Sequence, residues 1–402
     1  MRFWMAAGIF GVVVVGLGIV QIVRPVVAPQ MSVAVSGTHT IPGHLKFPWP
    51  SGVQAAEDVV GLGWIGGGQQ GPPAPEPIGS VAKLMTALLV VQKYPLGEYA
   101  SGPSLKMTSQ DAALYQSDLN TQQSAMAVSA GQRISERELL EGLLIPSGNN
   151  VAIMLSKWVA GSPKAFAVEM NQEAKRLGLT QTHYNGPVGL SPLTVSTVVD
   201  QVKLAEKVMQ SPVLAAISGM PQMTLPNGQI TYNYNNRLGR DGIFGVKTGS
   251  TVIGGASFIW AANAVLGGQN HTIYGGVFGV TAAGDQLGHA KNDGQALIVA
   301  ATKVVGWHDL WSAGASVGRI KTAWSAPVAL AVSHSVRILG WPSLKYRVRF
   351  IDQKHFSGSK PVPKDTKVGI LRVTYGSQII TVPVVTESRL PSASLVWKLR
   401  RV

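Results

Sequence analysis

Apolar residues along the chain fall into blocks whose spacing distinguishes helices from strands. The segment from Val81 to Val91 is almost entirely apolar and consists mainly of good helix formers. A helix without a polar face is buried rather than laid on a surface. The pattern therefore predicts a buried helix over residues 81–91, with Pro77 and Gly79 marking its start.

Further helices are predicted by capping residues and by apolar spacing. Ser135 and Glu138 form a capping-box pattern, and Asn150 stands where it can cap the helix that follows. Ser162 precedes a proline at the favoured first helical position. The predicted helices cover residues 139–145, 151–159, 163–177, 197–209 and 295–305.

Strands are predicted in two parts of the chain, with an irregular glycine-rich loop expected over 66–73. Leu344 to Phe350 alternates strictly between apolar and cationic residues, and a hairpin is predicted across Gly376 and Ser377. The sequence thus predicts an α+β fold, a helical cluster with an antiparallel sheet, followed by a small C-terminal all-β domain. The strand segments are residues 53–64, 243–246, 256–261, 272–280, 344–350, 368–375 and 378–385.

The first thirty residues predict a transmembrane anchor or a signal peptide. Phe3 to Val20 is uncharged and almost wholly apolar, which just reaches the length needed to span a bilayer core. Arg2 before this stretch favours an N-terminus inside the cell, and we favour a retained anchor. A cleaved signal peptide is the alternative, and either interpretation places the remainder outside the cytoplasm. We therefore expect a protein attached to the bacterial cell membrane, or secreted if segment 1–30 is cleaved.

The net charge of +14 is unevenly distributed along the 402 residues. From Arg337 onward there are 13 lysines and arginines against three acidic residues. The stripe of Lys345, Arg347 and Arg349 is either a solvated strand face or a surface for anionic lipid or wall polymer. No nucleic-acid-binding motif accompanies it, so we expect no nucleic-acid partner. The chain contains no cysteine, which excludes disulfide bonds and thiolate metal sites.

Ser80 and Lys83 form the first of three short motifs that carry chemistry. At helical spacing their side chains share a face about 5–6 Å apart, so the amine can reach the hydroxyl. Burial disfavours the charged amine, and a neutral lysine can take a proton from serine. The same spacing at Ser357 and Lys360 lies in a polar stretch with no predicted helix.

Two further motifs follow in order, Ser147-Gly148-Asn149 and Lys247-Thr248-Gly249. The first lies in a turn between two predicted helices, where a hydroxyl can relay a proton and an amide can orient a substrate or the lysine. The second follows a short apolar strand, where a cation and a hydroxyl suit a carboxylate and a glycine lets a peptide backbone lie alongside. Each motif alone is common, and the ordered set is far more specific.

With these motifs the sequence resembles the low-molecular-mass penicillin-binding proteins, serine D-Ala-D-Ala carboxypeptidases with a β-lactamase/transpeptidase-like fold. The resemblance covers roughly residues 50–280, and the segment after about 325 resembles the family's accessory domain by position and strand content. Residues 31–45 show no clear period and are predicted to form a linker, followed by a serine peptidase domain over 46–322 and a basic β-rich accessory domain over 323–402. Beyond the short motifs themselves the resemblance extends over residues 139–150, 170–171, 177–179, 182–184, 189–190, 196–197 and 241–242.

The resemblance implies an acyl-transfer reaction on a peptidoglycan stem peptide. Ser80 would attack the penultimate D-alanine carbonyl, with Lys83 taking its proton. Ser147 and Asn149 would pass a proton to the leaving D-alanine. β-Lactam antibiotics would acylate Ser80 and remain attached as covalent inhibitors.

The resemblance also implies how the substrate is held. Lys247 and Thr248 would bind the terminal carboxylate, and Gly249 would allow close approach of the peptide. The backbone N–H groups of Ser80 and Ser250 would stabilise the oxyanion.

Two positions depart from the family pattern and leave substrate preference open. Ser191 stands where many relatives have aspartate, and Asn185-Gly186-Pro187 stands where they commonly have Asn-Pro. The alternative functions are a β-lactamase-like hydrolase on the same fold and a non-catalytic cell-wall-binding protein. We expect no cofactor and no metal, His183 in a structural role, and Glu169 on a solvated helix face.

Overall fold

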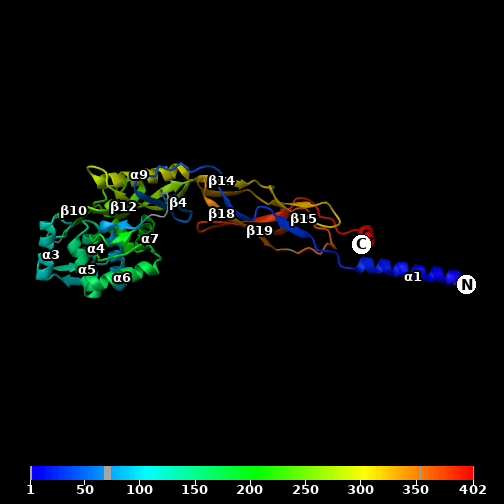
Figure 1. The fold of residues 1–402 in the computed structure, drawn as a ribbon, viewed down its shortest axis with the longest axis horizontal. Helices are drawn as coiled ribbons and strands as arrows, with labels where there is room; N and C mark the ends of the chain where they lie inside the picture. The colour runs from blue at the N-terminus through cyan, green and yellow to red at the C-terminus, as the bar shows by residue number, and fades with distance from the viewer. Residues whose placement is uncertain (1, 68–73, 226, 354, 402) are drawn as a thin grey trace. The chain divides into compact units, whose positions relative to one another are not determined.

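The computed structural model describes residues 2–67, 74–225, 227–353 and 355–401 (Figure 1). The chain forms two compact units. One consists of residues 45–305 and contains the three motifs, and the other joins residues 1–44 to residues 306–402. Most of the predicted glycine-rich loop, residues 68–73, lies outside the described residues.

The 45–305 unit is built on an antiparallel sheet whose described strands run in the order β11-β12-β13-β3-β4. The bounds are β3 Gln54–Val59, β4 Gly63–Gly67, β11 Ile243–Thr251, β12 Gly255–Leu266 and β13 Gln269–Val280. The segment predicted as one strand over 53–64 is thus a hairpin. β11 extends beyond the predicted 243–246, so Lys247-Thr248-Gly249 lies within an edge strand rather than after it.

Helices cover both faces of this sheet (Figure 1). Leu297 of α9 packs with Phe258 and Trp260 on one face, whereas Val202 of α7 and Ile259 belong to the core on the other. The bounds are α2 Lys83–Lys93, α3 Ser109–Asn120, α4 Glu136–Leu144, α5 Asn149–Ala160, α6 Pro163–Arg176, α7 Val198–Met209, α8 Pro212–Ser218 and α9 Gln286–Val304.

Most predicted helix starts are confirmed. The buried helix is present as the 3₁₀ turn η1 (Gly79–Ala82) followed by α2. The capping box at α4 is formed, since Ser135 Oγ accepts from the Glu138 amide (3.2 Å) and the Glu138 carboxylate accepts from the Ser135 amide (2.7 Å). Ser162 caps α6.

The capping role predicted for Asn150 is wrong. Helix α5 begins at Asn149, two residues before the predicted start at residue 151, with Gly148 at its N-cap. The buried Asn150 amide instead accepts from the backbone N–H of Met126 (3.0 Å) and donates to the Met126 carbonyl (2.8 Å). This pairing ties the preceding loop to the turn that contains the second motif.

Helix α9 begins earlier than the predicted residue 295. Two glycines interrupt the apolar pattern in its first half, so the pattern predicted only the second half of the helix. One of them, Gly294, packs directly on the sheet. A Cβ at that position would lie 2.9 Å from atoms of both Phe258 and Trp260, so the glycine allows close packing rather than ending the helix.

The second unit contains an antiparallel sheet with the described strands in the order β1-β15-β16-β20-β19-β18-β2, and a separate β14-β17 pair. The strict alternation over 344–350 and the hairpin across Gly376 are confirmed as β18 and as the β19-β20 pair. The bounds are β1 Gln30–Val33, β2 Gly37–Thr40, β14 Gly306–Trp311, β15 Ser316–Lys321, β16 Val328–Val332, β17 Val336–Gly340, β18 Lys345–Asp352, β19 Lys367–Tyr375 and β20 Gln378–Thr386.

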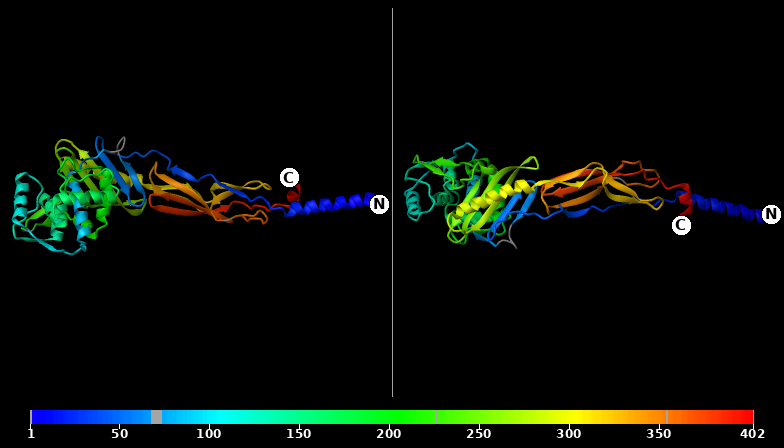
Figure 2. Two further views of the ribbon diagram at one scale, coloured as in Figure 1. Left: turned by 60° about the horizontal axis from the view of Figure 1, so that its bottom comes forward. Right: turned by 90° about the horizontal axis from the view of Figure 1, so that it is seen from above.

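Residues 31–45, predicted as a linker, instead contribute strands to the second unit. β1 pairs with β15 and β2 pairs with β18, as the blue segments beside the orange and red strands show (Figure 2). β14 and β15 also belong to this unit, so it resumes at 306 rather than at 323. β1 and β2 are each only four residues long, and β2 contains no large apolar residue, so the sequence pattern did not reveal them.

The ends of the chain form helices α1 (Arg2–Val23) and α10 (Leu395–Arg400). Among the described residues, no helix has the length and apolar character that a membrane crossing requires.

Glu57 on β3 is a carboxyl group buried in the core, and its burial predicts how stability depends on pH. Its side chain is fully buried, and neither carboxyl oxygen has a hydrogen-bond partner among the described residues, so burial raises the pKa of Glu57 well above its usual value. The folded protein then holds a proton here that the unfolded chain releases above about pH 4.5, and stability falls as the pH rises. We expect Glu57→Gln to be more stable than wild type by about 1–3 kcal/mol at pH 8.

Urea unfolding of the full chain at pH 5 and pH 8 measures this effect. The gain should shrink at pH 5, close to the ordinary pKa of the unfolded carboxyl. A variant less stable than wild type at pH 8 would show that Glu57 makes a stabilising contact as a carboxylate.

Candidate active site

Ser80 and Lys83 meet where η1 runs into α2. Lys83 is the first residue of the helix, one turn after Ser80, and its Nζ donates a 2.8 Å hydrogen bond to Ser80 Oγ. The Lys83 side chain is fully buried. The apolar run beginning at Val81 buries this turn, so the amine is held away from solvent.

The turn of the second motif supplies the remaining partners of the Lys83 amine. Nζ lies 2.8 Å from the Ser147 carbonyl oxygen, 3.2 Å from Ser147 Oγ and 2.6 Å from Asn149 Oδ1. Ser147 has a left-handed φ of 60°, a conformation that is rare outside glycine and concentrated at functional sites. With Ser80 Oγ, four oxygens surround a group that has three N–H donors when charged. Either serine hydroxyl can therefore donate to the lone pair of a neutral amine.

The environment favours that neutral amine. Burial is the main reason that the pKa of Lys83 lies well below its usual value, and the positive charge of Lys247 lowers it further. The charge of Asp118 opposes both effects. A partly neutral lysine beside a serine hydroxyl can act as a general base.

Lys247 lies on β11, at the edge of the sheet, and its side chain is 2% exposed. Its Nζ donates to the Thr248 carbonyl at 3.0 Å. Burial lowers the pKa of Lys247 to about 7. A bound carboxylate would favour the charged form, so this lysine can couple anion binding to proton uptake.

Gly249 has a structural role that the sequence did not reveal. A Cβ at Gly249 would lie 2.6 Å from the Ile78 carbonyl oxygen, and a Cβ at Gly79 would lie 2.9 Å from the Ser250 backbone N. The two glycines thus let η1 pack directly against β11. This contact places Ser80 beside Ser250 and brings the first and third motifs to one cleft.

The cleft has a volume of about 140 Å³. It is lined by Ser80, Ser124, Ser147, Tyr234, Thr248, Gly249, Ser250 and Leu287. Residues from all three motifs therefore share one opening, which can admit the end of a peptide chain.

The sequence profile of the D-alanyl-D-alanine carboxypeptidases matches residues 69–272, half of the chain. The chain belongs to this family. This carboxypeptidase is a serine-type hydrolase.

Curated relatives agree with this membership. D-alanyl-D-alanine carboxypeptidase DacF of Bacillus subtilis is 24% identical over 80% of this chain and 82% of its own length. DacB2 of Mycobacterium tuberculosis is 35% identical, but over 36% of this chain and 52% of its own.

Solved structures show the same fold. Penicillin-binding protein 5 from Haemophilus influenzae aligns with a TM-score of 0.62 at 17% identity, over 87% of this chain and all of that chain. DacD from Francisella tularensis aligns with a TM-score of 0.56 at 19% identity, over 90% and 97% of the two chains. Both alignments extend beyond the 45–305 unit of this carboxypeptidase.

Sequence reasoning missed several residues in or next to the cleft. Ser124 and Tyr234, whose hydroxyl oxygens lie 3.5 Å apart, come from irregular segments without periodicity. Gln123 accepts a hydrogen bond from Asn149 Nδ2 at 3.2 Å. Leu287 lies in the part of α9 that the pattern did not predict. No local motif marks any of these four positions.

The other candidate residues are not among those that line this cleft. Ser357, of the second serine–lysine pattern, belongs to the other compact unit, where its hydroxyl lies 2.6 Å from that of Ser359. Glu169 is half-buried on α6, and the backbone of His183 bridges to Val195. In the part of the chain that the structure describes, no cluster of three or more potential ligand side chains could hold a metal ion.

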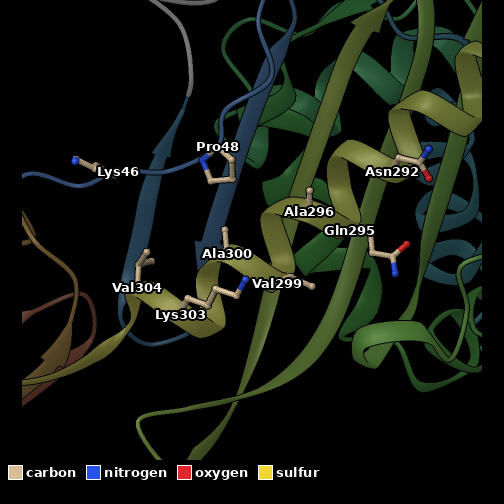
Figure 3. A pocket seen from close by; sticks show the side chains of 9 residues that line it. All are labelled: Lys46, Pro48, Asn292, Gln295, Ala296, Val299, Ala300, Lys303 and Val304. Carbon is tan, nitrogen blue, oxygen red and sulfur yellow. The ribbon is translucent and has the colours of Figure 1, made fainter.

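A larger pocket of about 710 Å³ lies along α9 of this carboxypeptidase, facing residues 46–48 (Figure 3). Ala296 and Ala300 of the helix point toward Pro48, with Lys303 at one end. None of the motif residues lines it, so it is separate from the Ser80 cleft.

Proposed function

We propose that the protein is a penicillin-sensitive serine carboxypeptidase that removes the terminal D-alanine from peptidoglycan stem peptides through an acyl-enzyme on Ser80. The observation that carries this proposal is the buried Lys83 amine, within hydrogen-bond distance of Ser80 Oγ, Ser147 Oγ and Asn149 Oδ1. A serine, a base whose charged form is disfavoured by burial, and a second hydroxyl are the groups that acyl transfer requires.

In the acylation step, Ser80 Oγ attacks the carbonyl of the penultimate D-alanine while its proton passes to Lys83 Nζ. The negative charge that develops on the carbonyl oxygen rests on the backbone N–H groups of Ser80 and Ser250, an arrangement that contributes about 10²–10³-fold to the rate. The C–N bond then breaks as a proton moves from Lys83 through Ser147 to the leaving amine. D-Alanine departs and the shortened peptide stays as an ester on Ser80.

In the deacylation step, water attacks the ester and gives its proton to Lys83. The bond between Ser80 Oγ and the acyl carbon breaks, and the proton returns to Ser80.

Lys247 and Thr248 hold the terminal carboxylate before the first step, as a charge-assisted pair in a buried site. Asn149 keeps the Lys83 amine in place through its 2.6 Å contact.

Location follows from the function and from the first segment. Stem peptides lie outside the cytoplasm, so the 45–305 unit must be exported. We propose that segment 1–30 attaches the protein to the bacterial cell membrane, supported by the uncharged apolar run from Phe3 to Val20. We also propose that the basic second unit, residues 306–402 with 1–44, acts as an accessory domain.

Penicillin labelling of the full chain, followed by peptide mapping, tests the proposed function. We expect a lasting adduct on the peptide that contains Ser80, together with release of D-alanine from a pentapeptide ending in D-Ala-D-Ala. An adduct on another residue would exclude the proposed nucleophile. Rapid turnover of penicillin would favour a β-lactamase-like hydrolase, and binding of the pentapeptide without D-alanine release would favour a wall-binding protein.

A further inference from the structure

A second pocket of about 360 Å³ adjoins the Ser80 cleft. The two share Ser250, so the pocket continues the cleft along the C-terminal end of β11. Its volume is within the range of small-ligand sites, about 300–1,000 Å³. Its other principal lining residues are Pro77, Gln123, Leu190, Pro192, Val252 and Ile253.

Two loops form the apolar walls of this pocket, and both are braced. In the β11-β12 turn, the Gly254 amide donates to Thr251 Oγ1 at 2.7 Å, which holds Val252 and Ile253 outward. In the other loop, Ser191 Oγ accepts from Asn185 Nδ2 at 2.9 Å and from the Leu193 amide at 3.2 Å. The serine at this family-variable position therefore closes its own loop and presents Leu190 and Pro192 beside it.

The apolar walls are exposed without a covering segment of the described chain. Val252 and Ile253 have exposed fractions of 105% and 71%, and Leu190 has 45%. None of the described residues that line the pocket carries a charge. An ammonium or carboxylate placed here would lose hydration without gaining a partner of opposite charge, whereas an apolar group would gain from leaving water.

The direction of β11 determines which part of a bound substrate lies at this pocket. With the terminal carboxylate at Lys247 and the scissile carbonyl at Ser80, the rest of the peptide runs antiparallel to β11, past Ser250 toward Val252. β11 is an edge strand, and an extended peptide can add to such an edge. The residue preceding the two terminal D-alanines then lies at the apolar pocket.

We propose that this pocket selects stem peptides whose residue before D-Ala-D-Ala presents an uncharged side chain, including one whose amine or carboxylate is masked by acylation or amidation. This inference rests on the proposed function. Val252, Ile253 and Leu190 are the specificity-determining residues. Gln123, which contacts Asn149 as well as the pocket, links substrate fit to the catalytic turn.

The test compares D-alanine release from three peptides, Nα-acetyl-X-D-Ala-D-Ala with X as norleucine, Nε-acetyl-lysine or lysine. We expect kcat/KM for the two uncharged peptides to exceed that for the lysine peptide by about tenfold or more, as for other apolar specificity pockets. Val252→Glu should lower that ratio by a similar factor, because a carboxylate at the pocket favours the ammonium.

The matched control is Val265→Glu. Val265 is exposed on β12 but lies near the opposite end of this strand from the β11-β12 turn, so the ratio should not change. Equal kcat/KM for all three peptides, or the same ratio in both glutamate variants, would overturn the specificity proposal while leaving the carboxypeptidase intact. Failure to release D-alanine from any peptide would instead contradict the proposed function.

Discussion

Methionine in place of Lys83 should lower the rate of Ser80 acylation by about 10²–10⁴-fold, the usual contribution of general acid–base catalysis. Methionine retains most of the volume and apolar surface of the lysine stem, so the buried turn should stay packed. What it removes is the amine that contacts both serine hydroxyls and Asn149. The measurement is the second-order rate constant for penicillin labelling.

The pH profile separates a lost base from a displaced serine. In the wild type, kcat/KM should rise with pH as Lys83 loses its proton. Because the pKa of Lys83 is lowered, this rising limb of the pH profile should lie at a lower pH than the pKa of an ordinary lysine. The Lys83→Met variant should lose that limb, with Ser80→Ala defining zero labelling. Wild-type labelling by Lys83→Met would show that the Ser80 proton goes elsewhere.

Methionine in place of Lys247 should lower kcat/KM for peptides by about 10²–10³-fold, in line with the 2–5 kcal/mol lost when one partner of a buried charge pair is truncated. In the wild type, kcat/KM should fall above about pH 7, because Lys247 then loses the charge that binds the carboxylate. The variant should lack this fall. Lys247→Met should lower kcat/KM far less for a peptide amide, which lacks the terminal carboxylate. Equal losses of kcat/KM for the acid and the amide would exclude carboxylate binding as the role of Lys247.

Stability provides the control for this variant. The pKa of Lys247 is about 7 in the fold against 10.5 ordinarily, so the unfolded chain binds the extra proton between these values. The wild type therefore loses stability as the pH falls from about 10.5 to about 7. Lys247→Met lacks this loss, and at pH 7 it should unfold at a urea concentration no lower than the wild type does.

Local chemistry accounts for what the sequence predicted well. The helix around Lys83 and the capping box at Ser135 depend on neighbouring residues in the chain, and both are present. The serine–lysine contact follows from a single helical turn, and the structure shows it at 2.8 Å. Helices, caps and contacts that depend only on residues close together in the chain can be predicted from the sequence pattern alone.

Features set by distant partners were not readable in this way. The Asn150 amide pairs with Met126 rather than capping its helix, because tertiary contact provides both a donor and an acceptor. Gly249 is predicted to let a peptide approach closely, but the sequence does not reveal that its lack of a Cβ also makes room for the Ile78 carbonyl. Tyr234 and Leu287 enter the site through folding that no short motif encodes.

The strands β1 and β2 have a consequence for how the protein is made. Gln30 pairs with Lys321 and Thr40 with Lys345, so each strand leaves the ribosome about 300 residues before its partner. The whole 45–305 unit is translated in between and can fold while both early strands still present unpaired edges, which are prone to aggregation. A recombinant fragment ending at 322 would leave β2 permanently without β18, whereas one cut at 45 and 305 separates no strand from its neighbour.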